Sequence, residues 1–246
     1  MFKAKLALGP MSSEVIEAAF RFSHFHRKQL MLIASKNQID YSGGYVNNWT
    51  TKQYVNFIKE MKNKYQNSDI KICRDHCGPG FNGKHELKDV YNTIKADIEN
   101  NFDLIHIDFC MHKGEKEEKL NEAKKAIQYC LELNPNIGLE IGTDENEGIN
   151  FNISNLEELK KEINFFKSFC KPEFYVIQTG SLIKEINQIG NFNKEFVSSV
   201  SKILNANNIK LKEHNPDYLA INDIRQRAGI IDAMNMAASQ KNRFTQ

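Results

Sequence analysis

The sequence lacks several features that would place it in a common class of protein. No apolar run approaches the roughly 20 residues that span a bilayer, and the opening MFKAKLALGPMSSE has no long apolar stretch before a small-residue cleavage site. Five cysteines, an odd number, are scattered through 246 residues, which does not suit a disulfide framework. We therefore expect a cytoplasmic protein with reduced thiols and no membrane partner.

A strong charge of either sign is also missing. The 33 basic residues oppose 31 acidic ones and leave a net charge of +2, so no global field would attract a nucleic acid. No low-complexity segment or Pro/Ser-rich linker divides the chain. With 41% hydrophobic residues the chain can bury one large core, and we predict a single domain over residues 1–246.

Short apolar runs recur along the chain and alternate with segments of helical periodicity. The segments 51–65 and 117–133 each place their apolar residues on one helix face. Capping boxes are predicted at Thr50 with Gln53 and at Ser154 with Glu157. The eight runs that we predict as strands are 4–8, 30–34, 70–73, 104–109, 137–141, 174–177, 209–211 and 229–233.

Eight strands that alternate with helices predict an α/β protein with a parallel sheet, namely a TIM (β/α)8 barrel. The alternative is an open doubly wound sheet, but the first turn, LGPMSSE, has no G-x-G-x-x-G motif. After the eighth predicted strand only MNMAASQKNRFTQ remains. This segment is too short and too polar for a good closing helix. We expect either a truncated chain or a barrel that a partner completes.

Ionisable residues gather where the predicted strands end, which is where barrels of this class build active sites. Nitrogen and oxygen donors of this kind suit a divalent ion such as Zn²⁺. A thiolate site at Cys73 and Cys77 is disfavoured, because no second cysteine pair completes four ligands. The strand-end residues are three histidines, His76, His106 and His214, and four carboxylates, Asp75, Asp108, Glu140 and Glu147.

Other polar and aromatic residues admit two interpretations each. Arg74 either holds an anionic substrate or pairs with an acid, and we favour the ion pair. Asn37 and Gln178 either donate hydrogen bonds to substrate hydroxyls or cap their own loops, which amides commonly do. The aromatic run RFSHFHRKQL (21–30) either forms an interface or packs a helix on the barrel, and packing is the simpler interpretation.

The stretch RDHC resembles the end of the third strand in the class II, metal-dependent aldolases of sugar bisphosphates. The resemblance implies that Asp75 transfers a proton at the hydroxyl of the bond being cleaved and that His76 binds zinc. It also implies metal positions at Asp108 in HID, at Glu140 and Glu147 in LEIGTDENEG, and at His214 in KEHN, and a substrate contact at Asn235.

Two departures from that family put its full activity in doubt. The zinc-binding histidine expected after the sixth strand is absent from IQTGSLI, and the glycine-rich phosphate cradle is replaced by HNPDYL, in which Pro216 offers no N–H. Six blocks in order, SKNQIDYSGGYV, RDHCGPG, IHIDFCM, EIGTD, KEHNPDYL and GIIDAMN, are more similar to the non-catalytic subunit family of class II D-tagatose-1,6-bisphosphate aldolase. In that family, the barrel supports a catalytic partner chain.

We therefore predict a subunit that supports or performs aldol cleavage of a phosphorylated sugar, with a divalent metal, zinc by preference. Its partners would be a sugar phosphate and either a catalytic aldolase subunit or further copies of itself. Two alternatives stay open: an aldolase active on its own with another phosphorylated or nucleotide-linked sugar, and a metal-free barrel that binds a sugar phosphate.

Overall fold

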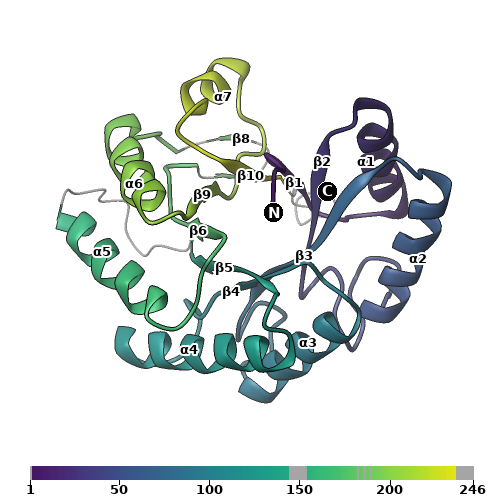
Figure 1. The fold of residues 1–246 in the computed structure, drawn as a ribbon, viewed down its shortest axis with the longest axis horizontal. Coiled ribbons are helices and arrows are strands. Elements are labelled where there is room, and N and C mark those ends of the chain that lie inside the picture. Colours follow the sequence, from purple (N-terminus) through teal and green to yellow (C-terminus); the bar gives the residue numbers. More distant parts are fainter. Residues whose placement is uncertain (1, 144–153, 182, 185–186, 189, 237–246) are drawn as a thin grey trace. The chain divides into compact units, whose positions relative to one another are not determined.

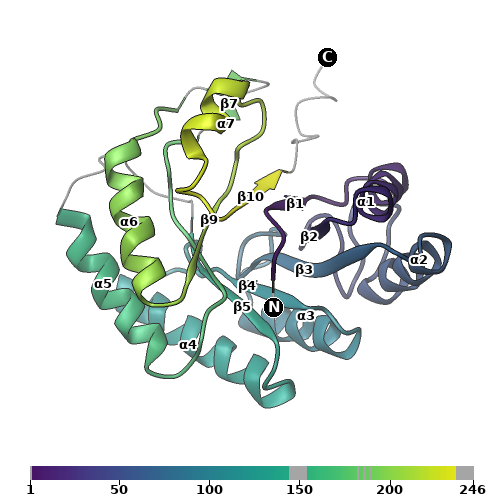
Figure 2. The same ribbon diagram turned by 45° about the horizontal axis from the view of Figure 1, so that its top comes forward.

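The fold class is a TIM (β/α)8 barrel, as predicted: strands and helices alternate along the chain (Figures 1 and 2). This structure, a computed structural model, describes residues 2–143, 154–181, 183–184, 187–188 and 190–236. Its contacts form two compact units, Met1–Glu140 and Ile141–Gln246. Each unit is described on its own below, and a single domain over the whole chain stays a prediction.

The first unit is a run of parallel strands with helices between them. Pairing follows chain order from β1 to β5. The predicted ranges agree with the structure to within a few residues, and only β3 is much longer than predicted. The elements are β1 (Leu6–Leu8), α1 (Ser13–His26), β2 (Gln29–Ser35), α2 (Thr51–Lys64), β3 (Asp69–Cys77), α3 (Leu87–Glu99), β4 (Leu104–Ile107), α4 (Lys116–Leu133) and the start of β5 (Gly138–Gly142).

Local sequence explains where these helices begin. At α2, the Thr50 side chain accepts from the Gln53 backbone and the Gln53 side chain accepts from the Thr50 backbone, so the predicted capping box is confirmed. Ser12 caps α1 by accepting from the backbone of Val15. Each side chain satisfies an N–H group that has no partner within the helix.

A hydrophobic core lies between β2, β3 and the inner faces of α1 and α2. Burial of this surface is the main favourable term for the unit. Phe20, directly before the aromatic run, is fully buried here, as the packing interpretation requires. Within the run, Phe22 and Phe25 are 46% and 67% exposed, so packing on the barrel is wrong for these two residues. The other members include Ile16, Ala19, Leu30, Leu32, Ala34, Tyr54, Val55, Ile58, Met61, Ile70, Ile72 and Phe102.

The second unit contains a parallel set, β6-β9-β10, and an antiparallel pair, β7-β8, that was not predicted. Its elements are the end of β5, α5 (Ser154–Lys167), β6 (Phe174–Val176), β7 (Ile183–Lys184), β8 (Asn187–Gln188), α6 (Lys194–Ala206), β9 (Lys210–Glu213), α7 (Ile221–Arg227) and β10 (Ala233–Met236). Helix α5 begins at Ser154, whose side chain lies outside the described residues, so that capping box stays a prediction.

The eighth barrel strand was placed too early in the sequence. The apolar run 229–233 forms a turn up to its last residue, because the amides of Ile230 and Ile231 bond to the carbonyl of Arg227 at the end of α7. Strand β10 starts at Ala233. Residues 237–246, where an incomplete closing helix was predicted, lie outside the described residues. None of the described helices is long and apolar enough to cross a membrane.

A buried ion pair fixes the loop after β2. Lys36 Nζ donates to Asp89 Oδ2 at 2.6 Å and to the Gly78 carbonyl at 3.3 Å. Asp89 also accepts from the Tyr41 hydroxyl at 2.8 Å and from Asn82 Nδ2 at 2.9 Å. Burial alone would raise the pKa of Asp89, but the hydrogen bonds from Lys36, Asn82 and Tyr41 outweigh it and lower the pKa from 3.8 to about 2.

This pKa predicts part of the acid sensitivity of the fold. Because the pKa of Asp89 is lower in the folded state, the ionised carboxylate stabilises the fold above pH 3.8. This stability is lost as the pH falls through about 2. Between about pH 5 and 2.5, the wild type should therefore lose roughly 1–2 kcal/mol more unfolding free energy than Asp89→Asn. Urea unfolding at several pH values measures this difference, with exposed Glu157→Gln as the control. Equal losses in wild type and Asp89→Asn would contradict it.

Candidate functional site

The end of β3 departs from regular pairing with β4. The register shifts between Arg74 and Cys77, and His76 has φ 43°, in the left-handed region where histidine is among the more tolerant residues. Asp75 and His76 therefore fall in the irregular part of the ladder. The backbone N–H of His76 donates to Nδ1 of His106 on β4, at 3.3 Å.

A glycine lets the ends of β3 and β4 come together. A Cβ atom on Gly78 would lie 1.5 Å from the carbonyl oxygen of Asp108, so no other residue fits there without moving the backbone. Strand β3 ends at Cys77, directly before the Gly78-Pro79-Gly80 turn. The turn thus helps to place the β3 residues beside those of β4.

Asp75, His76 and His106 converge in the first unit. Each offers one ligand atom, and these atoms lie within 4.8 Å of one another. Asp75 Oδ1 is 3.6 Å from His106 Nδ1, and Glu140 Oε1 is 3.9 Å from the same nitrogen. Glu140 pairs directly with His106 in the register of β4 and β5. Asp75, His106 and Glu140 are all buried, whereas the side chain of His76 is partly exposed.

Asp108 orients His76. Its Oδ2 lies 2.8 Å from His76 Nδ1, and its Oδ1 accepts from the backbone of Cys110 at 3.0 Å. Burial alone would raise the pKa of Asp108, but the hydrogen bond and charge of His76, with the charge of His106, lower it. Phe81 stacks on the His76 ring with centroids 4.6 Å apart. Nε2 is thereby left as the His76 nitrogen that can bind a metal.

The donor set of this group fits a divalent metal ion. Imidazole nitrogens and carboxylate oxygens are ligands that Zn²⁺ accepts, and a carboxylate bonded to the other nitrogen of a ligating histidine is the usual supporting arrangement. His76 and His106 would each hold the ion through one ring nitrogen, with Asp75 or Glu140 as the oxygen donor. The structure thus supplies in His106 a second histidine within the first unit.

Arg74 forms a buried ion pair, as favoured from the sequence. Its Nε and Nη2 each donate to one carboxylate oxygen of Asp97 on α3, both at 2.6 Å. Its Nη1 donates to the carbonyls of Ala34 and Ile39, at 2.9 and 2.5 Å. Both ionic side chains are fully buried. Since its donors are engaged in this way, Arg74 is part of the core beneath the site.

The cysteines beside the site remain thiols. Cys73 and Cys77 form no disulfide and are fully buried. Burial raises the pKa of Cys77 to about 12, and the nearby Asp97 carboxylate adds to the effect. Because a metal binds the thiolate, this environment agrees with leaving Cys73 and Cys77 out of the predicted ligand set.

The remaining predicted residues have varied surroundings. In the second unit, buried His214 follows β9, and its Nε2 lies 2.7 Å from Asn235 Nδ2. Gln178 Oε1 accepts from the Gly180 backbone at 2.8 Å, which supports the interpretation as a loop cap. Asn37 is exposed in the loop after β2. Glu147 lies outside the described residues.

One buried polar group of the second unit was missed entirely. Arg227 Nε contacts both Glu213 oxygens, at 2.9 and 2.8 Å, and Arg227 Nη2 donates to the Ser181 hydroxyl at 2.9 Å. Ser181 in turn donates to Glu213 at 2.7 Å. Arg227 also covers the ring of Phe192 at 4.1 Å. This group ties the loop after β6 to β9 and α7, and its only sequence signal is a charged pair 14 residues apart.

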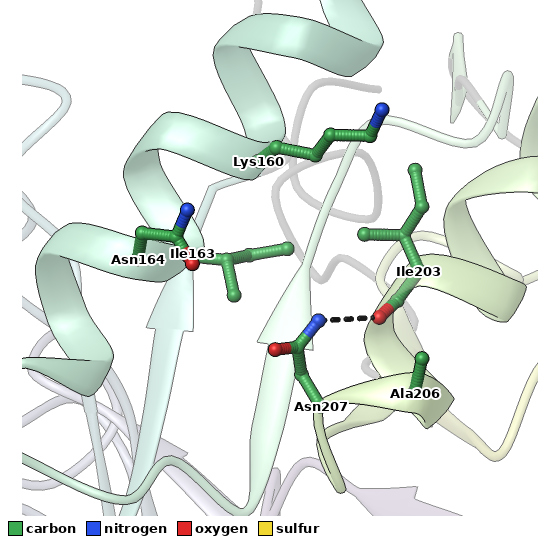
Figure 3. A pocket seen from close by; sticks show the side chains of 6 residues that line it. All are labelled: Lys160, Ile163, Asn164, Ile203, Ala206 and Asn207. Carbon is green, nitrogen blue, oxygen red and sulfur yellow. Dashed lines mark hydrogen bonds between the residues drawn. The ribbon is translucent and has the colours of Figure 1, made fainter.

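Two surface hollows of the second unit lie away from these residues. One lies between α5 and α6 (Figure 3), and the other lies around the turns that precede β6 and β9. Neither is lined by a predicted site residue. The first is lined by Lys160, Ile163, Asn164, Ile203, Ala206 and Asn207.

Comparison with solved structures supports the fold. A probable tagatose 6 phosphate kinase from Sinorhizobium meliloti 1021 superimposes over 95% of this chain and 64% of its own, with TM-score 0.79 and 20% identity. The chain thus spans less than two thirds of that protein. Fructose-bisphosphate aldolase from Campylobacter jejuni matches over 95% of this chain and 71% of its own, with TM-score 0.72 and 16% identity.

A putative fructose-1,6-biphosphate aldolase from Coccidioides immitis matches over 95% of this chain and 76% of its own, with TM-score 0.67 and 16% identity. These identities establish the fold alone. The sequence itself matches one family over residues 7–131, just over half of the chain, and this stretch lies in the first unit and includes Asp75, His76, His106 and Asp108. The chain belongs to the D-tagatose-1,6-bisphosphate aldolase subunit GatZ/KbaZ-like family.

Proposed function

We propose that this protein is a tagatose-bisphosphate aldolase-type subunit that acts with a catalytic aldolase chain on a phosphorylated sugar. Membership of a family of aldolase subunits supports the assembly with a partner. The observation that carries the proposal is the convergence of Asp75, His76 and His106 within 4.8 Å, where the fold class places active sites.

Each residue of this group has a proposed role. His76 and His106 bind a divalent ion, preferably Zn²⁺, while Asp108 holds His76 through the 2.8 Å contact. Glu140, buried beside His106, supplies a carboxylate for the ion. His214 and Glu147 remain candidate ligands through the family resemblance alone. When bound, the ion supplies Lewis-acid polarisation of a substrate carbonyl.

Asp75 is the proposed general base. Its carboxylate would accept the proton of the substrate hydroxyl at the carbon whose C–C bond breaks. The O–H electron pair then forms the aldehyde carbonyl, and the electrons of the broken C–C bond pass to the other fragment as its enediolate. The low exposure of Asp75, 8%, keeps water from competing for this proton.

A second candidate function is aldol cleavage without a partner. The observation that favours it is the presence of a proton acceptor and two metal-binding nitrogens in one unit of a single chain. The missing histidine after the sixth strand argues against it only if His106 cannot replace that ligand. We propose the subunit role first, because the family description is that of a subunit.

Proton exchange separates the two functions. The protein is incubated with dihydroxyacetone phosphate in heavy water, first alone and then with a catalytic class II aldolase chain, and loss of the C3 proton signal is followed by NMR. The subunit role predicts faster exchange by the mixture than by the catalytic chain alone, and no exchange by this protein alone. Exchange by this protein alone that His76→Ala abolishes would favour the second function. A mixture no faster than the catalytic chain would contradict the subunit role.

A further inference from the structure

The imidazole of His76 is held from two directions by residues that are not themselves proposed ligands. Asp108 Oδ2 lies 2.8 Å from Nδ1, which fixes that nitrogen but lets the ring tilt about the line of the contact. Phe81 lies against the face of the same ring, with centroids 4.6 Å apart and planes 22° from parallel. A flat side chain stacked in this way blocks the tilt that the Asp108 contact permits.

Phe81 belongs to a tight turn in the loop between β3 and α3. The Gly80 backbone donates to the Lys84 carbonyl at 2.6 Å, and the Gly83 backbone donates to the Gly80 carbonyl at 2.9 Å. The Asn82 side chain accepts from the Lys84 backbone at 3.1 Å. Gly80 and Gly83 have φ angles of 87° and 79°, which glycine adopts without strain. Phe81 and Asn82 are therefore held together in one closed turn.

Asn82 fastens this turn to two buried carboxylates. Its Nδ2 donates to Asp89 Oδ2 at 2.9 Å and to Asp40 Oδ2 at 3.2 Å, and both acids are buried. Hydrogen bonds to an ionised acceptor are stronger than those between neutral groups. Lys36, which pairs with Asp89, also donates to the Gly78 carbonyl at 3.3 Å and so holds the start of the loop. The loop that carries Phe81 is thus fixed at its start and at Asn82.

The placement of Phe81 points to the ligand and not to the core. Phe81 is only partly buried, and the hydrophobic core that the described residues form in the first unit does not include it. The face of an aromatic ring carries partial negative charge. Such a face favours an imidazole that has become more positive, as His76 would on binding a divalent cation.

We propose that Phe81 is a positioning residue for the metal ligand His76, and that Asn82 keeps Phe81 in place by anchoring its loop on Asp89 and Asp40. This inference rests on the metal-binding role of His76 in the proposed function. It adds that the loop after β3 determines how firmly that ligand is oriented. Loss of the Phe81 ring would leave every ligand present but less well oriented, and affinity falls when a site must order its own ligands.

Zinc affinity of the full chain, measured by competition with a chromogenic chelator, tests the proposal. Phe81→Leu keeps an apolar side chain but removes the flat face, and should raise the Kd for Zn²⁺ roughly tenfold, as loss of a supporting residue does. Phe81→Tyr keeps the face and should bind as the wild type does. Phe57→Leu is the matched control: it makes the same change in a partly buried ring that packs on Trp49 at 5.0 Å, outside the metal group, and should leave the Kd unchanged. Circular dichroism checks that each variant folds.

The visible spectrum of bound Co²⁺, another divalent ion that such ligands accept, gives a readout that a loss of stability would not change. At saturating Co²⁺, Phe81→Leu should shift the absorption bands, because the geometry of the ligands changes while their identity does not. Phe57→Leu and Phe81→Tyr should give the wild-type spectrum.

A double-mutant cycle tests the anchor. Asn82→Ala should raise the Kd for Zn²⁺ in the same direction as Phe81→Leu. When it is added to Phe81→Leu, its effect should be smaller than its effect alone, because the anchor acts through the Phe81 ring. Fully additive effects would overturn the role of Asn82.

Three other results would overturn the role of Phe81. The first is a Phe81→Leu variant with the affinity and the Co²⁺ spectrum of the wild type. The second is equal weakening by Phe57→Leu, and the third is a Phe81→Tyr variant as weak as Phe81→Leu. A wild type that binds no stoichiometric Zn²⁺ would remove the proposed metal role and this inference together. A mixture that exchanges protons no faster than the catalytic chain would contradict only the subunit role, because these affinities are measured without a partner or substrate.

Discussion

Arg74→Ala is expected to lower the free energy of unfolding by about 3–5 kcal/mol, or to prevent folding altogether. The variant leaves the Asp97 carboxylate at the centre of the core with both of its 2.6 Å partners removed. The carbonyls of Ala34 and Ile39 lose their contacts with Arg74 as well. A buried charge without its counterion is among the most destabilising changes that one substitution can make.

A matched pair on the same helix provides the control. Lys95 and Glu99 on α3 are 3.8 Å apart and more than half exposed, so Lys95→Ala should cost well under about 1 kcal/mol. Replacing both partners, as in Arg74→Met with Asp97→Leu, should recover much of the loss, because no buried charge remains. Urea unfolding followed by circular dichroism measures all of these variants. An Arg74→Ala variant as stable as Lys95→Ala would show that the pair contributes nothing.

The Arg74–Asp97 pair shows how much of a buried ion pair can be predicted from the sequence. Arg74 directly follows the apolar residues of β3 and is itself buried, and Asp97 occupies a core position of α3 together with Val90 and Ile94. A charged residue is unexpected at either buried position, and the ion pair between them accounts for both. The ion pair was predicted at Arg74, but its acid was not, because no local pattern joins residues 23 positions apart.

The fold class was predictable because its signal is local and repeats. Apolar periodicity predicts the helices 51–65 and 117–133, and the capping residue Thr50 also marks the start of the first. The start of β10 was wrong, because an apolar run cannot by itself distinguish a strand from a turn that packs its side chains inward. The extension of β3 through Asp75 and His76 was missed because these residues are polar, and the prediction ended the strand where the apolar run ends.

The site was predictable in composition but not in assembly. Asp75, His76, Asp108 and Glu140 were identified from their strand ends, and the structure brings them together within the first unit. His106 was noted at a strand end but not assigned as a ligand. The position of His106 in the group depends on the register His106↔Glu140 and on the irregular pairing at His76. Neither can be predicted from the sequence alone.

Metal binding should therefore depend on His106 as much as on His76. His76→Ala and His106→Ala remove proposed ligands, and each should weaken Zn²⁺ binding by more than the roughly 10–100-fold typical of a lost supporting carboxylate. Asp108→Asn should fall within that 10–100-fold range, because it keeps Nε2 of His76 but loosens the ring. Competition with a chromogenic chelator measures the affinity of each folded variant, independently of activity.

Two further variants make the ranking decisive. His112→Ala removes a histidine that packs on Phe109 at 5.9 Å and lies outside the group, so it should bind Zn²⁺ as the wild type does. His214→Ala tests the ligand that only the resemblance implies. If His106→Ala binds normally while His76→Ala does not, His106 only orients the backbone of His76 through the 3.3 Å contact. If the wild type binds no stoichiometric Zn²⁺, the metal assignment fails, although membership of the aldolase-subunit family does not depend on it.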